Sequence, residues 1–359
     1  MTSSVKPAQP TQSELTRATN FYRVAIVGAA TLKGREVAEV LNDRNFPSLD
    51  VKLLDDDETL GQLEAVGDEV TFIQRVRAEE FAHVDFTFFA SDPDCTLKVW
   101  KTARDAGSSI VDLSYALEDE PSASLRAPWI ERQLDKALIP ELQPGPVVVA
   151  HPAAVVLALL SLRIRKTLDL KRVVATVFQP ASEHGQKGMD ELHQQTVNLL
   201  SFQPLPKNVF DVQVAFNLVS RYGEQVAVPV AALESRILKH YRRILGQDAS
   251  PMSLLLLQAP IFHGHAFALH VEAAQLADIE RITQSLAGEH VQVVHGAEEA
   301  PTNVNAAGQG DVRVSVLPDA GQPNGFWLWA ASDNLRIAAS TAVECAETMA
   351  ASRPRGKIQ

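Results

Sequence analysis

A β-rich run that ends in glycine and opens into a helix constrains the fold of this chain most. Residues 21–28 read FYRVAIVG, and residues 35–41 then follow a helical period. Short apolar runs recur along the next hundred residues, separated by segments long enough for helices; they lie at 51–54, 84–89, 110–113 and 147–150. Such alternation predicts an α/β domain with a Rossmann-like, doubly wound parallel sheet.

The pattern changes after residue 152. We expect a long apolar helix over 153–167, further helices, and longer alternating strands. The expected strands are 172–178, 252–258, 265–272, 312–316 and 326–331, and the further helices are 188–202, 230–245 and 335–349. This pattern predicts an α+β domain of the dimerisation or catalytic type, with a mixed sheet.

The length of 359 residues accommodates two cores. We expect four parts, of which the first is a flexible polar tail and the last is a helix that returns to the first domain. The parts are the tail at 1–20, a dinucleotide-binding domain at 21–152, the second domain at 153–334 and the final helix at 335–352.

Charge and hydropathy exclude several classes of partner. A formal net charge of -11 and a pI near 5.4 oppose binding to nucleic acid. No apolar run reaches the roughly 18 residues of a membrane span, and the N-terminus has no apolar leader. We therefore expect a cytoplasmic protein with neither nucleic-acid nor membrane partners.

The chain has two cysteines, Cys95 and Cys345, too few for a disulfide framework or a structural zinc site. We expect both to be buried thiols. The alternative for Cys95, at the start of a predicted helix, is a thiol of lowered pKa.

The first turn reads GAATLKG, from Gly28 to Gly34, and lies where a nucleotide-binding turn should. Thr31 stands where the full fingerprint has the glycine that lets backbone amides approach the pyrophosphate. We expect its side chain to project toward the pyrophosphate and weaken binding. The alternative is an inherited tight turn that binds no cofactor.

An acidic run, Asp55 to Glu58, follows the second predicted strand. A carboxylate there accepts the ribose hydroxyls of NAD but repels the extra phosphate of NADP. Like charges about 4 Å apart repel by up to ~4 kcal/mol near a protein surface. If a cofactor binds, NAD is therefore favoured over NADP, whereas a solvated acidic loop is the alternative.

Five segments, in order and spacing, resemble aspartate-semialdehyde dehydrogenases and together span residues 21–349. They are VAIVGAATLKG at Val24, FQPASEHGQKGMDEL at Phe178, VAFNLV at Val214, QAPIFHGHA at Gln258 and DNLRIAAS at Asp333. The resemblance implies a Rossmann domain, a dimerisation and catalytic domain, and a returning C-terminal helix. It also implies a homodimer, with hetero-association with an active paralogue as a further possibility, and it places Asn334 among the cofactor-binding residues.

In that family a cysteine thiolate attacks the aldehyde, a histidine acts as general acid and base, and phosphate releases the acyl group. The cysteine lies at a helix N-terminus, where the helix dipole lowers its pKa. This chain reads HPAA from His151, which puts Ala154 at the nucleophile position. Loss of the nucleophile in a comparable mechanism lowers the rate by on the order of 10⁶.

Substrate-binding positions also differ from the family. The resemblance places Gln258 where an arginine forks onto the substrate carboxylate, and neutral glutamine cannot form that pair. Glu118 stands where an arginine helps to hold phosphate, and His240 where a glutamate faces the substrate's ammonium group. Aspartate semialdehyde is therefore not the evident ligand.

Three family positions are retained. Gln179 matches the active-site glutamine, His265 the general acid and base, and Arg236 a basic phosphate-binding residue. The alternative is that these side chains persist only for packing or hydrogen bonds. The whole pattern most resembles the Usg-type paralogues, which also lack the cysteine.

Four histidines fall around the former active site in the same comparison, namely His151, His184, His240 and His265. Four imidazoles could bind zinc if they converged within ~2.1 Å of one ion. Packing histidines are the alternative, and we assign no metal.

Three hypotheses follow for function. The first is a catalytically silent homologue that acts as a binding or regulatory dimer. The second is an NAD(P)-dependent oxidoreductase in which His265 assists a cysteine-independent reaction on another aldehyde, carbonyl or alcohol. The third is a structural partner of an active paralogue.

Overall fold

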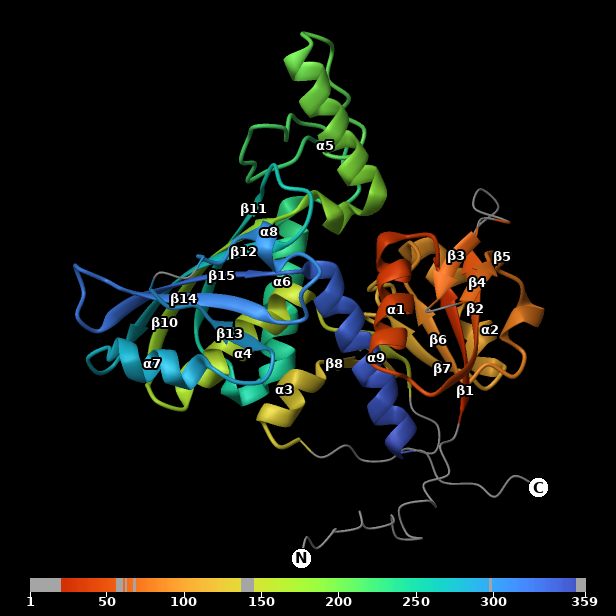
Figure 1. Ribbon diagram of the computed structural model, residues 1–359, viewed down its shortest axis with the longest axis horizontal. Helices are drawn as coiled ribbons and strands as arrows, with labels where there is room; N and C mark the ends of the chain where they lie inside the picture. The colour runs from red at the N-terminus through yellow and green to blue at the C-terminus, as the bar shows by residue number, and fades with distance from the viewer. Residues whose placement is uncertain are drawn as a thin grey trace, which may run out of the picture.

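Two β-sheets, each with its own helices, organise the molecule (Figure 1). The computed structural model describes residues 21–55, 61, 63–66, 69–136, 145–296 and 299–352. The tail expected at 1–20 and residues 56–58 of the acidic run lie outside this part of the chain.

The first sheet has seven strands in the order β5-β2-β1-β6-β7-β9-β8, and all its pairings are parallel. Its strands are β1 (Tyr22–Val27), β2 (Ser48–Asp55), β5 (Gln74–Arg75), β6 (Phe86–Phe89), β7 (Ser109–Asp112), β8 (Ser124–Arg126) and β9 (Val147–Val149). A small antiparallel hairpin, β3 (Leu63–Val66) and β4 (Glu69–Phe72), accompanies it. The predicted Rossmann-like parallel sheet is confirmed.

Helices cover both faces of this sheet, as a doubly wound fold requires. The first, α1 (Leu32–Asp43), and the last, α9 (Asn334–Ser352), share a core with β1 and β6 on one face. On the other face lie η1 (Ala78–Phe81) and α2 (Pro93–Asp105). Asp92 caps α2 by accepting a hydrogen bond from the backbone N–H of Cys95.

The second sheet has six strands in the order β11-β10-β12-β15-β14-β13 and mixes parallel with antiparallel pairs, as predicted. Its strands are β10 (Leu170–Gln179), β11 (Met252–Gln258), β12 (His265–Ala273), β13 (Val291–Val293), β14 (Val312–Pro318) and β15 (Gly325–Ser332). The remaining helices are α3 (Pro128–Gln133), α4 (Pro152–Arg165), α5 (Gly185–Leu200), α6 (Val230–Leu245), α7 (Ile279–Leu286) and α8 (Asn303–Ala306), with 3-10 turns η2 (Ala181–His184) and η3 (Gly246–Asp248).

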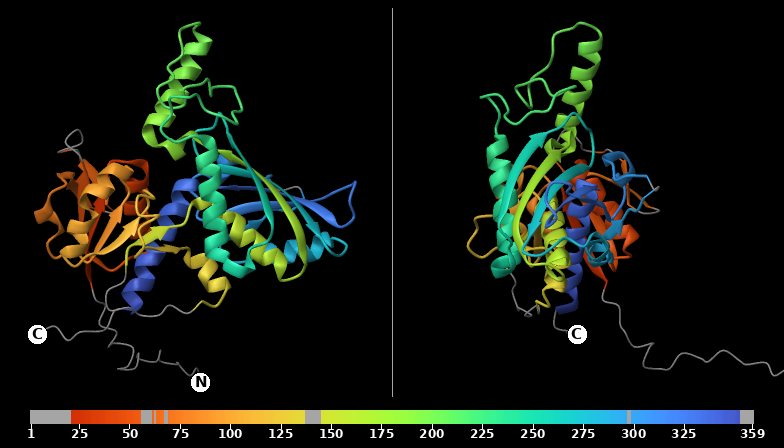
Figure 2. Two further views of the ribbon diagram at one scale, coloured as in Figure 1. Left: turned by 180° about the vertical axis from the view of Figure 1, so that it is seen from behind. Right: turned by 90° about the vertical axis from the view of Figure 1, so that its left-hand side faces the viewer.

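Helix α4 forms the centre of the second core, together with α6 and α7 on one face of the sheet. Every residue of α4 from Pro152 to Ile164 is buried, so this helix, which is apolar except for Ser161 and Arg163, is enclosed on all sides. The side chain of Arg163 is satisfied because it donates to the backbone carbonyls of Leu286 and Glu289. In contrast, α5 projects away from the sheet (Figure 2).

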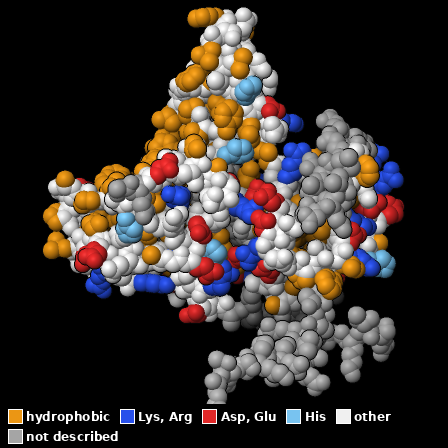
Figure 3. All heavy atoms as spheres, in the orientation of Figure 1, with side chains coloured by type: hydrophobic (Ala, Val, Ile, Leu, Met, Phe, Trp, Pro, Cys, Tyr) orange, Lys and Arg blue, Asp and Glu red, His pale blue; other side chains and the backbone are white. Residues whose placement is uncertain are grey.

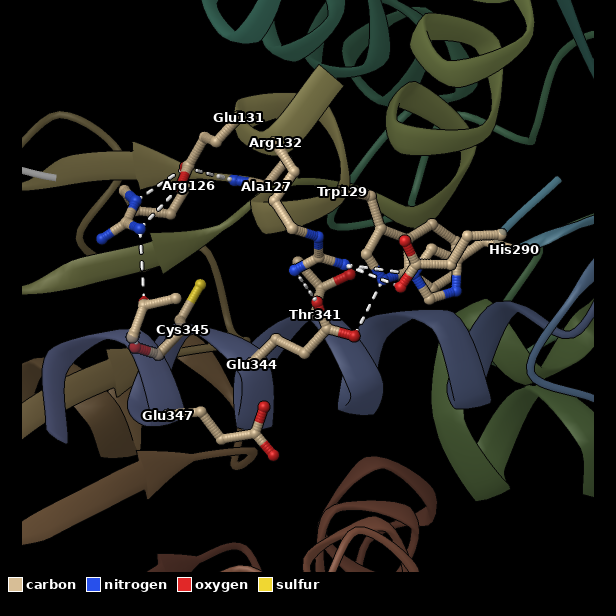
Figure 4. Close-up of polar contacts among 12 residues, drawn as sticks. Arg126, Ala127, Trp129, Glu131, Arg132, His290, Thr341, Glu344, Cys345 and Glu347 are labelled. Atoms are coloured by element: carbon tan, nitrogen blue, oxygen red, sulfur yellow. Dashed lines mark hydrogen bonds and ion pairs between the residues drawn. The ribbon is translucent and has the colours of Figure 1, made fainter. Parts of the chain in front are cut away.

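Glu344 of α9 joins three helices at the junction of the two sheets (Figure 4). Its carboxylate accepts from Trp129 Nε1 at 3.0 Å and pairs with Arg132 Nη1 at 2.8 Å and Arg44 Nη1 at 3.2 Å. The Trp129 ring stacks on His290, with centroids 4.0 Å apart. These contacts fix α9 against α1 and α3.

Candidate functional site

The segments that the sequence comparison assigned to an active site meet at one end of the second sheet. Gln179 is the last residue of β10, and His265 is the first residue of its antiparallel neighbour β12. Ser332, at the end of β15, pairs with His265 across the sheet. Ala154 lies in the first turn of α4 and is fully buried.

His151 joins the two sheets, since it follows β9 and caps α4. Its Nδ1 accepts from the N–H of Ala153 at 3.2 Å, which assigns its proton to Nε2. Its own backbone N–H donates to Nδ1 of His240 at 2.9 Å, so the proton of that ring is also on Nε2. Burial lowers the pKa of His151 to about 3, and burial also lowers the pKa of His240. Both rings are therefore neutral donors at neutral pH.

Glu183 is a site residue that the sequence reasoning missed. Its Oε2 lies 3.7 Å from Nε2 of His151, and its Oε1 lies 3.6 Å from Nε2 of His265 and accepts from Asn334 Nδ2 at 3.0 Å. Burial opposes its ionisation, but His151, His265 and Lys33 lower its pKa to about 2. The signal was present in the sequence, because Glu183 follows the end of a predicted strand within one of the five segments.

His184 belongs to a neighbouring network of amide, phenol and imidazole groups. Its Nε2 lies 2.8 Å from the hydroxyl of Tyr222 and 3.2 Å from Nε2 of Gln179. The Tyr222 hydroxyl donates to Oε1 of Gln258 at 2.7 Å. Both hydrogens of the Gln258 amide are used as well, toward the carbonyls of Gln179 and Ala259 at 3.0 Å. Gln258 is thus fully engaged within the protein.

Glu118 lies at the centre of a third cluster of polar side chains, in which its carboxylate pairs with two neighbouring cations, Arg236 and Lys239. Its Oε2 accepts from Arg236 Nε at 2.8 Å, and its Oε1 lies 2.9 Å from Lys239 Nζ and 3.4 Å from His240 Nε2. Burial opposes its charge, yet these three contacts hold the pKa of Glu118 well below its usual range. Arg236 also lies over the ring of Tyr115, 5.0 Å from its centroid.

The four histidines do not surround one point. His151, His240 and His265 lie close together, whereas His184 faces Tyr222 and Gln179. Among residues that the structure describes, no group of three or more His, Cys, Asp or Glu side chains is arranged to hold a metal ion. The four imidazoles therefore do not converge on a common point.

The turn from Gly28 to Gly34 is tight, and both of these glycines are needed for its shape. Gly28 has φ +83°, and a Cβ on Gly34 would lie 2.1 Å from the carbonyl oxygen of Gly28. The expectation that the Thr31 side chain projects toward the pyrophosphate is wrong for its hydroxyl, whose one hydrogen is shared between the carbonyls of Gly28 and Ala90 and whose oxygen accepts from the N–H of Gly34. Thr31 is the N-cap of α1, and Asp55 accepts from the N–H of Ala30 at 2.7 Å.

Lys33 extends from this turn toward the second domain. Its Nζ donates to the carbonyl of Leu113 at 3.3 Å and lies 4.9 Å from the ring centroid of Tyr115. Burial lowers the pKa of Lys33, although Glu183 and Asp112 oppose this shift. Lys33 and Tyr115 are further residues that the sequence reasoning did not single out.

Both cysteines were expected to be buried, but only Cys345 is, and Cys95 is partly buried. Cys345, on α9, is fully buried among residues of β1 and α1. Cys95, on α2, packs against the core that α2 shares with the first sheet. Burial raises the pKa of both thiols, so the alternative of a lowered pKa for Cys95 is wrong.

Comparisons with known proteins agree with this architecture. Residues 23–139 match the semialdehyde dehydrogenase NAD binding domain, and residues 160–337 match the semialdehyde dehydrogenase dimerisation domain. A USG-1 protein homologue of Pseudomonas aeruginosa is 32% identical over 88% of this chain and 94% of its own length. The chain belongs to the semialdehyde dehydrogenase family.

Two further members of the family illustrate the extent of the similarity. An aspartate-semialdehyde dehydrogenase of Rickettsia bellii is 28% identical over 92% of this chain and 98% of its own length. The structure of a probable aspartate-semialdehyde dehydrogenase from Pseudomonas aeruginosa superposes with a TM-score of 0.81 and 30% identity, over 92% of this chain and 99% of that one. The resemblance to aspartate-semialdehyde dehydrogenases and Usg-type proteins predicted from the sequence is thereby confirmed.

The described part of the chain contains no helix whose length and apolar character would suit a bilayer crossing.

Proposed function

We propose that this semialdehyde dehydrogenase homologue does not perform the thiol-dependent oxidation of aspartate semialdehyde and acts instead as a binding or regulatory dimer. The observation that carries the proposal is the buried methyl group of Ala154 in the first turn of α4, beside His151. Covalent catalysis needs a nucleophile within reach of a base, and a methyl group has no lone pair with which to attack a carbonyl.

The distribution of thiols supports this reading. Cys345 lies in one core of the first sheet, Cys95 is partly buried against the other, and burial raises the pKa of each thiol. His265, by contrast, lies on the second sheet. Neither sulfur is therefore placed to serve as a substitute nucleophile beside that imidazole.

The state of the polar groups also supports a change of ligand. The side-chain amide of Gln258 donates both of its hydrogens to backbone carbonyls, and Arg236 forms an ion pair with Glu118. A substrate carboxylate or a phosphate would have to displace these internal partners, because buried anions need matched donors.

Turnover assays test the proposal directly. The purified protein, supplied with aspartate semialdehyde, phosphate and NADP or NAD, is expected to give no reduced nicotinamide above a blank without enzyme. An aspartate-semialdehyde dehydrogenase serves as the positive control. Turnover that depends on phosphate would contradict the proposal. If that turnover persisted after alkylation of the thiols, the reaction would not need a cysteine, and the role we give to Ala154 would be wrong.

The dimer part of the proposal rests on the match of residues 160–337 to a dimerisation domain. Large apolar side chains are exposed on α5 and the segment after it, including Leu200, Phe202 and Phe216 at 70%, 97% and 68% (Figure 3). Exposed apolar patches mark protein interfaces. Light scattering after gel filtration should give twice the 39.1 kDa chain mass, and co-purification with an active paralogue would indicate hetero-association.

One observation favours the second candidate, a cysteine-independent NAD-linked oxidoreductase. The hydroxyl of Thr31 bonds backbone groups of the turn and of Ala90, so it is directed away from the position of a pyrophosphate. The turn from Gly28 to Gly34 and the carboxylate of Asp55 would hold the dinucleotide, which supplies a hydride acceptor when bound. Calorimetric titration decides this: absence of heat with millimolar NAD and NADP would eliminate the second candidate.

A further inference from the structure

The carboxylate of Glu183 is a buried anion that no Lys or Arg side chain of the described residues contacts directly. Its side chain is 8% exposed, and no Lys or Arg nitrogen of the described residues lies within 4 Å of it. Asn334 gives it one hydrogen bond, while a carboxylate can accept about four. A buried charge is costly unless it is paired and hydrogen-bonded.

The imidazoles beside Glu183 do not neutralise it. Burial lowers the pKa of His151 and of His265, so both rings are uncharged at neutral pH. Lys33 is near enough to influence Glu183, but its Nζ bonds the carbonyl of Leu113. Lys33 therefore stabilises the negative charge of Glu183 at longer range, and no cation of the described residues contacts the carboxylate directly.

Polar atoms without partners gather at the adjoining sheet end. Of the seven buried side-chain atoms that lack a hydrogen bond in the described part of the chain, four belong to Gln179, His265 and Ser332. They are Gln179 Oε1, both ring nitrogens of His265, and Ser332 Oγ. His265 and Ser332 pair across the sheet, and both are fully buried.

This concentration of unpaired atoms requires an explanation. Each buried polar group without a partner costs about 1–3 kcal/mol. Native proteins retain such groups where a ligand or water supplies the missing bonds. Gln179 Oε1 and the Glu183 carboxylate are both acceptors, so the missing partner must carry donor hydrogens and, opposite Glu183, positive charge.

We propose that Glu183, His265, Gln179 and Ser332 form a binding site for a small ligand with a primary ammonium group and no carboxylate or phosphate. The ammonium donates to Glu183 and Gln179, and His265 and Ser332 bind an adjacent hydroxyl or carbonyl. An added acidic group would meet Gln258, whose donors are spent, and Arg236, which Glu118 already pairs. The inference rests on the proposed binding role and gives that role a ligand class.

Thermal unfolding of the full chain at pH 7.5 tests the site with three probes of similar size. Ethanolamine is a cation at this pH, glycolate is an anion, and ethylene glycol is neutral. We expect ethanolamine at millimolar concentration to raise Tm, and the other two to leave it unchanged. Equal shifts from all three probes, or a shift from glycolate alone, would overturn the proposal.

Two substitutions then locate the effect. Glu183→Gln keeps the shape but removes the charge, and should weaken ethanolamine binding on the order of 10- to 100-fold. Glu289→Gln, at a side chain that is 67% exposed, should leave binding unchanged. Unchanged affinity in Glu183→Gln would refute the assignment of this carboxylate.

A third measurement keeps the test decisive if Glu183→Gln does not fold. The imidazole resonances of His265 in the wild-type protein should move as ethanolamine is added and remain unmoved with glycolate. A site that responds to NAD but not to ethanolamine would make Glu183 part of a cofactor site and overturn the proposal. Because none of these readouts measures turnover, they are independent of the assay that tests for loss of the thiol-dependent reaction.

Discussion

Arg236 donates a hydrogen bond from its Nε to Oε2 of Glu118, 2.8 Å away. The resemblance to aspartate-semialdehyde dehydrogenases places both residues at positions that bind phosphate. In this chain the carboxylate of Glu118 neutralises the guanidinium of Arg236. Lys239 contacts the second oxygen of the same carboxylate at 2.9 Å. The anion-binding capacity of this region is thus satisfied from within the chain.

Removal of Glu118 should therefore expose an anion site. We expect Glu118→Gln to increase the affinity for inorganic phosphate by about ten-fold, since a charge-assisted hydrogen bond contributes about 1.5–3 kcal/mol and part of it is lost to solvent screening. Calorimetry at low ionic strength measures the change. Asp119→Asn is the matched control, because Asp119 is 91% exposed and its loss leaves the Arg236–Glu118 pair intact. An equal gain in both variants would point to general charge instead.

Ala154→Cys alone should not restore semialdehyde dehydrogenase activity. A thiol at this position would regain only the nucleophile, while Gln258 and Glu118 would still fail to bind a carboxylate and phosphate. Reduced nicotinamide is the readout, and thiol titration checks that the new sulfur is present. Ala158→Cys, equally buried one turn further along α4, is the control. Activity approaching that of a true dehydrogenase would show that the other substitutions matter little.

Stability should fall as the pH drops below about 6.5. Burial lowers the pKa of His151 to about 3 and that of His184 to about 4, whereas both titrate near 6.5 in the unfolded chain. Between the folded and unfolded pKa values the unfolded chain binds more protons than the folded protein. The stabilisation that the neutral imidazoles give the folded state is therefore complete above pH 6.5 and is lost toward pH 4. Each proton contributes a slope of about 1.4 kcal/mol per pH unit.

Urea unfolding at pH 7, 6 and 5 measures this slope. His184→Gln removes one of the buried imidazoles whose pKa is lowered, a set that also includes His151, His240 and His265, and should make the slope shallower. His83→Asn, at an exposed position with positive φ that asparagine tolerates, should leave it unchanged. A flat profile in the wild-type protein would contradict the neutral, buried state of these imidazoles.

Glu344→Gln should destabilise the protein by about 1–2 kcal/mol. The substitution removes the charge that faces Arg132 and Arg44, both of which are partly exposed and recover some hydration. Glu347 lies one turn further along α9 and is more exposed. Glu347→Gln should change the free energy of unfolding by less than about 1 kcal/mol. Denaturant unfolding compares the two variants. Equal losses of stability would show that Glu344 has no special role at the junction of the two sheets.

Regular, strongly periodic segments could be predicted closely from the sequence. The expected helix over 230–245 and strand over 252–258 coincide with α6 and β11. Short elements were missed, among them β8, α3 and β13, because three to six residues are too few for a period to emerge. The helix expected to begin at residue 188 begins at Gly185, since the preceding turn η2 runs into it.

The site could be predicted only in part. Local motifs brought Ala154, His151 and His265 to one region, because they lie at strand and helix ends. The orientation of Thr31 could not be predicted, since its hydroxyl bonds Ala90, which is 59 residues away in the sequence. The environment of Glu183 depends on partners from α9 and β12, so its buried charge emerges only from the folded arrangement.

The placement of α9 bears on how the protein is made. Ala342, Val343 and Ala346 complete the apolar core against β1 and α1, although more than three hundred residues separate them from those elements. During translation the first sheet therefore emerges with this face covered only in part, by α1. That part of the face stays uncovered until α9 has been synthesised, so a nascent chain stalled or truncated before α9 exposes apolar surface to chaperones and proteases.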